Sequence, residues 1–169
     1  VLLFTLVTSY SYSQLYVSNN RYVFTKDREV YVTGNVELNG ANSNLYLRNE
    51  GQLLQGTTGT STNKGEGKLS VFQEGTVNNY AYNYWCSPVG NASSATNPFG
   101  VSMLNRATDL TNSTPATLIT SLDGSTSNSN LSIASRWVFK FLSSSAYSQW
   151  ISVGSASTIN AGEGFTMKG

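Results

Sequence analysis

The chain has few side chains that could act as catalysts, and it contains no histidine. A Ser-His-Asp triad, a Cys-His pair and a histidine metal site all require that side chain, so the sequence excludes them. The single cysteine, Cys86, follows Trp85 in an aromatic segment and has no histidine to activate it. We expect Cys86 to be a small buried side chain rather than a nucleophile.

Nine acidic residues are present, and two of them, Asp109 and Asp123, lie in expected loops. A glycosidase needs two carboxylates roughly 5–10 Å apart, and nothing in the sequence brings these two together. The simplest interpretation is that they are solvated or capping residues of their loops. A calcium site is the open alternative, because Ca²⁺ binds carboxylate, amide and backbone oxygens. We therefore expect no cofactor, unless Ca²⁺ binds at Asp109 or Asp123.

Aromatic side chains are the remaining candidates for a site. Tyr82 and Tyr84 share one face of an expected strand, and Trp150 begins another strand. Tyr and Trp on a sheet face can stack on sugar rings or anchor a protein partner. The alternative is that aromatic residues fill the core, and we expect this of Trp85 and Trp137.

The composition predicts an all-β protein. Among the 169 residues, 11% are charged and 12% are aromatic, and the charged fraction is well below the usual level of about 25%. Abundant Ser, Thr, Asn and Gly are typical of extracellular β-proteins, and no segment has the apolar spacing of an amphipathic helix. The formal net charge is +1 and the ten basic residues are scattered. Nucleic-acid binding and attraction to anionic membranes therefore lack a basic cluster.

Short strands separated by Asn and Gly occupy residues 15–56. Val36-Glu37-Leu38 and Leu45-Tyr46-Leu47 alternate, which places the aliphatic residues inside and Glu37 and Tyr46 outside. Such short strands at this spacing fit either a tight meander or the coils of a small β-solenoid. We favour the solenoid-like arrangement.

The Gly/Thr-rich segment 57–67 is the expected linker between two domains. Beyond it, residues 68–169 contain expected strands at 77–86, 135–142 and 150–153, and a turn leading into a last strand at 159–167. This spacing favours an antiparallel β-sandwich, of jelly-roll type. The last strand ends within its pattern, so we expect the domain to be truncated at its C-terminal end.

The segment 1–13 has the composition of a signal-peptide remnant. Val1 to Val7 is an uncharged apolar run, followed by a polar segment in which Ser11 and Ser13 fit a small-x-small cleavage rule. A buried first strand is the alternative. The apolar run is shorter than the roughly 20 residues of a membrane span. We therefore expect a truncated N-terminus, export from the cytoplasm and no membrane insertion after cleavage.

Two motifs support a family resemblance: Y-x-Y-W-x-S-P-V at 82–89 and G-E-G-F-x-M-K-G at 162–169. With them, the chain resembles the β-rich N-terminal regions of flavobacterial (Bacteroidota) surface proteins that the type IX secretion system exports. The resemblance implies a secreted or outer-membrane-associated protein that engages the type IX machinery, and it brings no active site.

These observations predict a non-enzymatic module with a structural or adhesive role, which contacts a glycan or a cell-surface protein. The alternative is a carbohydrate-binding accessory module of a larger secreted polysaccharide-degrading enzyme. In that case the catalytic domain would follow residue 169.

Overall fold

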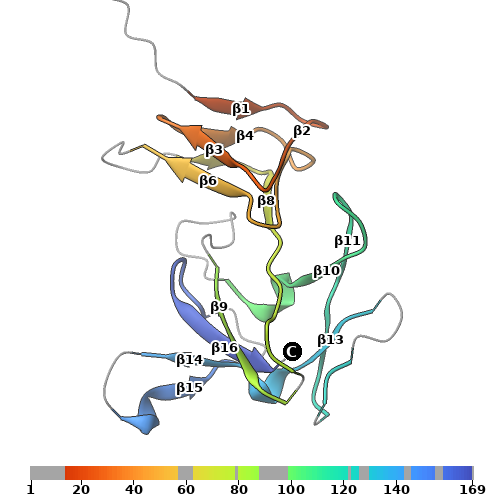
Figure 1. The fold of residues 1–169 in the computed structure, drawn as a ribbon, viewed down its shortest axis with the longest axis vertical. Coiled ribbons are helices and arrows are strands. Elements are labelled where there is room, and N and C mark those ends of the chain that lie inside the picture. The colour runs from red at the N-terminus through yellow and green to blue at the C-terminus, as the bar shows by residue number, and fades with distance from the viewer. Residues whose placement is uncertain are drawn as a thin grey trace, which may run out of the picture. The chain divides into compact units, whose positions relative to one another are not determined.

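The protein is all-β, as its composition predicts (Figure 1). The computed structural model describes residues 14–56, 63–78, 80–87, 99–121, 123–125, 130–142, 146–154 and 158–168. Within these ranges the regular elements are short strands and three 3₁₀ turns, and no helix is long and apolar enough to cross a membrane. The expected signal-peptide segment and most of the expected linker lie outside the described residues. The chain divides into two compact units, residues 1–70 and 71–169.

The first unit is built from parallel strand pairs. Its strands are β1 (Leu15–Val17), β2 (Tyr22–Lys26), β3 (Glu29–Val32), β4 (Val36–Leu38), β5 (Asn44–Arg48), β6 (Gln52–Gln55), β7 (Lys64–Gly65) and β8 (Lys68–Val71). β1 pairs with β4, β2 with β5, β3 with β6 and β4 with β7, always in parallel. β8 is the third strand of the sheet β2-β5-β8.

This pairing shows that the strands of the first unit repeat in sets of three. Leu15 lies opposite Val36, Tyr22 opposite Asn44 and Glu29 opposite Gln52. Strands consecutive in sequence therefore belong to different sheets, and each strand pairs with the third strand after it. A meander would pair consecutive strands antiparallel, so the structure excludes that alternative and has the strand pairing that stacked coils require.

Alternating side chains build the core of this unit. Val36, Leu38, Leu45 and Leu47 are buried, whereas Glu37 and Tyr46 are only partly so. The inward and outward directions expected from the sequence are confirmed. The buried members of the core are Val17, Val32, Val36, Leu38, Leu45 and Leu47.

The corners of the chain repeat with the strands. Asp27 after β2 and Asn49 after β5 both have left-handed backbones, with φ of 56° and 52°, which Asp and Asn tolerate better than most residues. At another corner the Asn42 side chain donates a hydrogen bond of 3.1 Å to the Asn20 side chain, and its backbone N–H bonds the Asn19 side chain at 3.3 Å. Equivalent corners in successive repeats keep the strands in register.

The first unit extends further along the chain than expected. The sequence predicts a linker over 57–67 and a second domain from 68. The described end of that linker contains β7, and Asn63 accepts a hydrogen bond of 2.9 Å from the backbone of Val36. The boundary between the units follows Ser70. A Gly-rich composition conceals this strand, because β7 contributes backbone pairing rather than apolar side chains.

The second unit contains one four-stranded antiparallel sheet in the order β15-β14-β16-β9. The hairpin β10–β11 is antiparallel and the pair β12–β13 is parallel. The strands are β9 (Tyr82–Cys86), β10 (Asn105–Ala107), β11 (Ser113–Pro115), β12 (Thr117–Ile119), β13 (Ser132–Ala134), β14 (Phe139–Phe141), β15 (Trp150–Ser152) and β16 (Gly164–Lys168). The 3₁₀ turns are η1 (Val101–Met103), η2 (Ser135–Trp137) and η3 (Tyr147–Gln149). The expected jelly-roll sandwich stays a prediction.

Two expected strands are shorter in the structure. The strand expected over 77–86 begins only at Tyr82, because the Asn78 side chain accepts hydrogen bonds from the backbone N–H groups of Tyr80 and Ala81 and forms a turn. The strand expected over 135–142 begins with the 3₁₀ turn η2, in which the Val138 N–H bonds the Ser135 carbonyl at 3.3 Å.

One face of the four-stranded sheet covers the core of this unit. Phe165 and Met167 of β16 belong to that core, and Trp85 of β9 packs against it. The other buried members are Phe99, Val101, Ile133, Val138, Val153 and Ile159. Because side chains alternate along a strand, Gly164, Thr166 and Lys168 lie on the opposite face.

Candidate functional site

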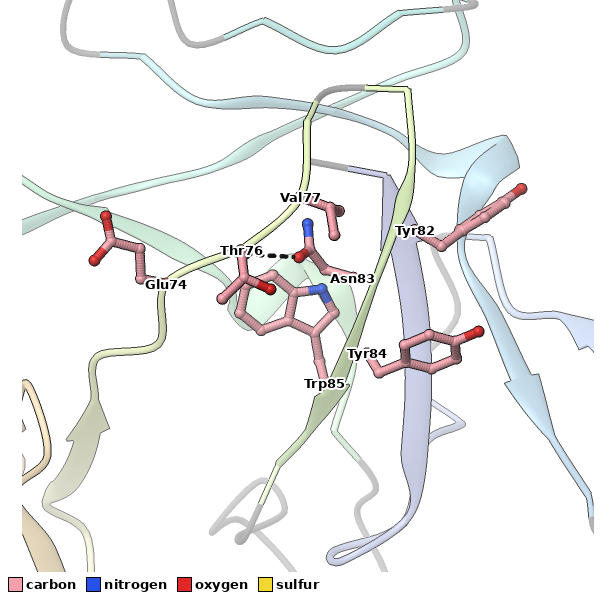
Figure 2. A pocket seen from close by; sticks show the side chains of 7 residues that line it. All are labelled: Glu74, Thr76, Val77, Tyr82, Asn83, Tyr84 and Trp85. Carbon is pink, nitrogen blue, oxygen red and sulfur yellow. Dashed lines mark hydrogen bonds between the residues drawn. The ribbon is translucent and has the colours of Figure 1, made fainter.

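The opposite face of this sheet gathers aromatic side chains. Figure 2 shows Tyr82 and Tyr84 on one side of β9, and Asn83 and Trp85 on the other. Residues directly opposite each other in a sheet point to the same face. The strand register therefore shows which residues of β16, β14 and β15 share a face with Tyr82 and Tyr84. We call this surface the aromatic face; its residues are Tyr82, Tyr84, Cys86, Trp137, Phe139, Phe141, Trp150, Ser152, Gly164, Thr166 and Lys168.

The register arranges this face in rows. Tyr84 lies opposite Thr166, Thr166 opposite Phe139, and Phe139 opposite Ser152. Neighbouring strands are about 4.8 Å apart, so a row over four strands spans about 14 Å. A neighbouring row contains Tyr82 opposite Lys168, and another contains Phe141 opposite Trp150. The face is therefore wide enough for an extended ligand, although Thr166, in the middle of the first row, is itself buried.

The three residues expected to bind a ligand all lie on this face. Tyr84 is 77% exposed, whereas Tyr82 and Trp150 are half-buried. Tyr82 packs edge-on against Phe139 with ring centroids 6.3 Å apart, and Trp150 packs against Phe141 at 5.0 Å. Because β9 and β15 are the two edges of the sheet, the tyrosines and Trp150 flank the face rather than forming one cluster.

Lys168 is a site residue that the sequence did not reveal. Its ammonium nitrogen lies 4.0 Å from the ring centroid of Trp137 and 5.4 Å from that of Tyr82. Such distances allow favourable cation–π contacts. The strand alternation of Phe165 and Met167 could have placed Lys168 on the outer face. Its aromatic neighbours depend on the pairing of β16 with β9 and its contact with η2, which no local pattern shows.

The phenol of Tyr82 has a raised pKa. Burial raises the pKa of Tyr82 above its ordinary value, and the nearby Tyr147 phenol raises this pKa further. Tyr147 is 89% exposed. At neutral pH the Tyr82 hydroxyl is therefore a hydrogen-bond donor, and it has none of the basicity that catalysis by a phenolate would require.

A cavity of about 310 Å³ lies beside β9 (Figure 2); its lining residues are Glu74, Thr76, Val77, Tyr82, Asn83, Tyr84 and Trp85. The Asn83 side chain accepts a hydrogen bond of 3.0 Å from the Thr76 backbone N–H, and the Trp85 indole N–H is buried with no partner among the described residues. Besides tyrosines, Glu74 is the only ionisable group in the lining that the structure describes. The cavity therefore does not assemble a pair of groups for acid–base chemistry.

Two expectations about this region are wrong. Cys86 is exposed rather than buried, because it ends the edge strand β9 on its outer side. Trp137 is half-buried on the aromatic face beside Lys168 and is not part of the core cluster. Trp85, in contrast, packs against the core as expected.

The Asp109 carboxylate is occupied by its own loop. It accepts hydrogen bonds from the backbone N–H groups of Thr111 and Asn112 at 2.8 and 2.7 Å, and from the Asn112 side chain at 2.7 Å. Asp123 is exposed. Among the described residues no group of three or more Asp, Glu or Cys side chains could hold a metal ion. The structure thus assigns Asp109 a capping role in its own loop.

We expect the carboxyl group of Asp109 to titrate well below an ordinary aspartate. The hydrogen bonds from Asn112 and Thr111 lower its pKa from 3.8 to about 2. Since the folded pKa is depressed, the loop stabilisation is complete above about pH 4 and is lost as the pH falls through 2. Carboxyl-carbon NMR over pH 1.5–6 measures this directly. A titration midpoint near 3.8 would contradict the capping geometry.

Comparison with known proteins gives no match: no family, no curated protein and no solved structure is similar to this chain.

Proposed function

We propose that this chain is a non-enzymatic module of a secreted or cell-surface protein, and that its structural or adhesive role depends on the aromatic face. The observation that supports this is the gathering of six aromatic rings on the sheet surface opposite the core. Large exposed aromatic patches on soluble domains are typical of interaction sites.

The sheet would act by holding the rings in place. Paired strands fix the backbone of Tyr82, Tyr84 and Phe139 on both sides of β16, and ring contacts limit rotation of Tyr82 and Trp150. A surface that is ordered before binding loses little conformational entropy on binding. In the same proposal the parallel strands of the first unit form a short β-solenoid that serves as a structural spacer.

Export to the cell surface is part of the proposal. It is supported by the signal-like residues 1–13 and by the two motifs at 82–89 and 162–169, which resemble those of type IX-secreted Bacteroidota proteins. The partner would be a glycan or a protein of another surface.

A second candidate function is that of a carbohydrate-binding accessory module of a larger polysaccharide-degrading enzyme. It is favoured by Gly164, which is exposed on the aromatic face. A Cβ atom added there would meet only the Trp85 carbonyl oxygen, at 3.9 Å. The glycine leaves open space among the rings, where the apolar side of a sugar ring could lie.

Alanine substitutions on the aromatic face test the proposal. We expect Tyr84→Ala and Trp150→Ala each to weaken binding by about tenfold or more, because aromatic anchors dominate such contacts. Arrays of plant, algal and bacterial polysaccharides and of extracellular matrix proteins serve as probes. Tyr31→Ala is the matched control: Tyr31 is 64% exposed on β3 of the other unit and should leave binding unchanged.

Three results would overturn the proposal. These are the absence of saturable binding to every probe, equal losses for Tyr84→Ala and Tyr31→Ala, or hydrolysis of a polysaccharide by the purified chain.

A further inference from the structure

We propose that the aromatic face selects an acidic polysaccharide, in which the carboxylate of a hexuronic acid pairs with the ammonium of Lys168 while the sugar ring stacks on neighbouring aromatic side chains. This inference rests on the proposed function of the face as a contact surface, and it names the ligand class.

The charge of the face is the first argument. Its outward-facing residues on the four strands are Tyr82, Tyr84, Cys86, Phe139, Phe141, Trp150, Ser152, Gly164, Thr166 and Lys168. None is acidic, and Lys168 is the single charged member of this set. Lys168 therefore gives the four-stranded part of the face one positive charge, which complements an anionic ligand. The nearest acidic group among those lining the cavity beside β9 is Glu74, which borders that cavity together with Tyr82 and Tyr84 but lies outside the sheet.

Lys168 is also available to a ligand. No carboxylate of the described residues forms an ion pair with it. The acidic residue nearest in sequence, Glu163, instead lies 3.3 Å from the ammonium of Lys140 and accepts a hydrogen bond of 2.8 Å from the Asn160 backbone. The cation of Lys168 contacts ring faces, which attract it but accept no conventional hydrogen bonds. With respect to the described residues, its three N–H donors therefore remain open to an anion.

The setting of Lys168 strengthens such a pair. The residue is half-buried, and its ammonium lies near the rings of both Trp137 and Tyr82. An anion bound there would be shielded from water by the rings, and charge-assisted hydrogen bonds are stronger than neutral ones in such surroundings. The Tyr82 hydroxyl, protonated at neutral pH, adds a neutral donor within the same row.

A hexuronic acid unit matches these features together. Its pyranose ring is rigid, presents C–H groups on one side for stacking, and carries a carboxylate at its rim. Tyr84 and the open space at Gly164 lie in successive rows of the sheet beside that of Lys168. One sugar unit can thus pair with the ammonium while a neighbouring unit stacks on a ring. A neutral polysaccharide would leave the ammonium without an anion, and an acidic peptide lacks the flat apolar side.

The test compares two ligands that share one sugar backbone and differ in whether the carboxyl groups are ionised or esterified. The full chain is titrated calorimetrically with oligogalacturonate and with the same oligosaccharide as its methyl ester, in low and in moderate salt. We expect the acid to bind about tenfold more tightly than the ester, and salt to narrow the difference. Lys168→Met, which keeps an unbranched apolar side chain and removes the ammonium, should remove the preference for the acid. Lys168→Arg should retain it.

The outcomes separate this inference from the proposed function. Equal affinity for acid and ester, with binding still lost in Tyr84→Ala, would overturn the preference for acidic sugars and leave the contact function in place. Equal binding of oligoglutamate and oligogalacturonate would overturn the assignment to sugars. Absence of binding to both oligosaccharides would overturn the inference, and the polysaccharide and matrix-protein arrays then decide on the function itself.

A second variant tests the position of the sugar ring. Gly164→Val should fold, because the new Cβ has 3.9 Å to its nearest neighbour and valine suits a strand. It fills the open space on the aromatic face, so we expect binding of both acid and ester to fall about tenfold or more. Unchanged binding with an intact fold would overturn the placement of the ligand over β16.

Discussion

Replacing Leu45 with alanine is expected to destabilise the first unit by about 2–5 kcal/mol, the usual cost of truncating a fully buried leucine. Leu45 is 0% exposed and lies in β5, the central strand of the sheet β2-β5-β8. The buried core of this unit, within the described part of the chain, has only six members, so the cavity removes a large share of its packing. Whole domains are stable by only about 5–15 kcal/mol. Denaturant unfolding followed by far-UV circular dichroism measures the loss.

Leu54→Ala is the matched control for this prediction. Leu54 is 40% exposed on β6 of the same unit, so its truncation leaves no cavity and should cost less than about 1 kcal/mol. Equal losses for the two leucines would contradict the assignment of the strand faces, because inward and outward positions would then contribute alike.

The strand faces of the first unit could be predicted because they depend only on neighbouring residues. Leu45 and Leu47 flank Tyr46, and a period of two decides which of them face inward. The repeat length could not be predicted in the same way. Equivalent corner positions share a backbone conformation rather than a residue type: Asp27 after β2 and Asn49 after β5 are both left-handed. The sequence therefore shows the short strands but conceals their partners.

The candidate site was predictable to the same extent. Alternation placed Tyr82 and Tyr84 on one face of β9, which the structure confirms. These two tyrosines share a surface with Trp150 and Lys168 only because the strand order is β15-β14-β16-β9. In that order β16, the last described strand, pairs with β9, which is the first strand of this sheet in the sequence. No local pattern contains that order. The exposure of Cys86 could not be predicted for the same reason, since it follows from the position of β9 at the sheet edge.

These limits also explain why the evidence for function comes from the second unit. In the first unit, outward-facing tyrosines such as Tyr16 and Tyr31 lie on separate sheets, and among its described residues only the pair Tyr22–Tyr46 packs ring against ring, with centroids 5.7 Å apart. In the second unit, one four-stranded sheet brings together side chains from four strands on a single surface. The width of the antiparallel sheet, rather than the number of aromatic residues, thus creates a surface to which an extended ligand can bind.

Gly65→Ala is expected to detach β7 from β4 and to cost the first unit about 3 kcal/mol or more. Gly65 has a φ of +111°, which side-chain-bearing residues rarely adopt, and an added Cβ would collide with the Leu38 carbonyl oxygen and lie 2.6 Å from its carbon. The collision is with backbone, so no side chain can move aside. Hydrogen exchange at the Gly67 N–H, which bonds the Leu38 carbonyl at 3.0 Å, should accelerate together with the loss of stability.

Gly154→Ala separates the two contributions to this cost. Gly154 also has a positive φ, +58°, but nothing lies within 4 Å of an added Cβ. Its substitution should cost only the left-handed backbone term, about 1–2 kcal/mol. If Gly65→Ala costs no more than Gly154→Ala, β7 is not held against β4 as described, and the first unit would end before residue 64. A larger cost at Gly65 means that the Gly-rich segment belongs to the fold of the first unit, where its glycine permits two parallel backbones to approach closely.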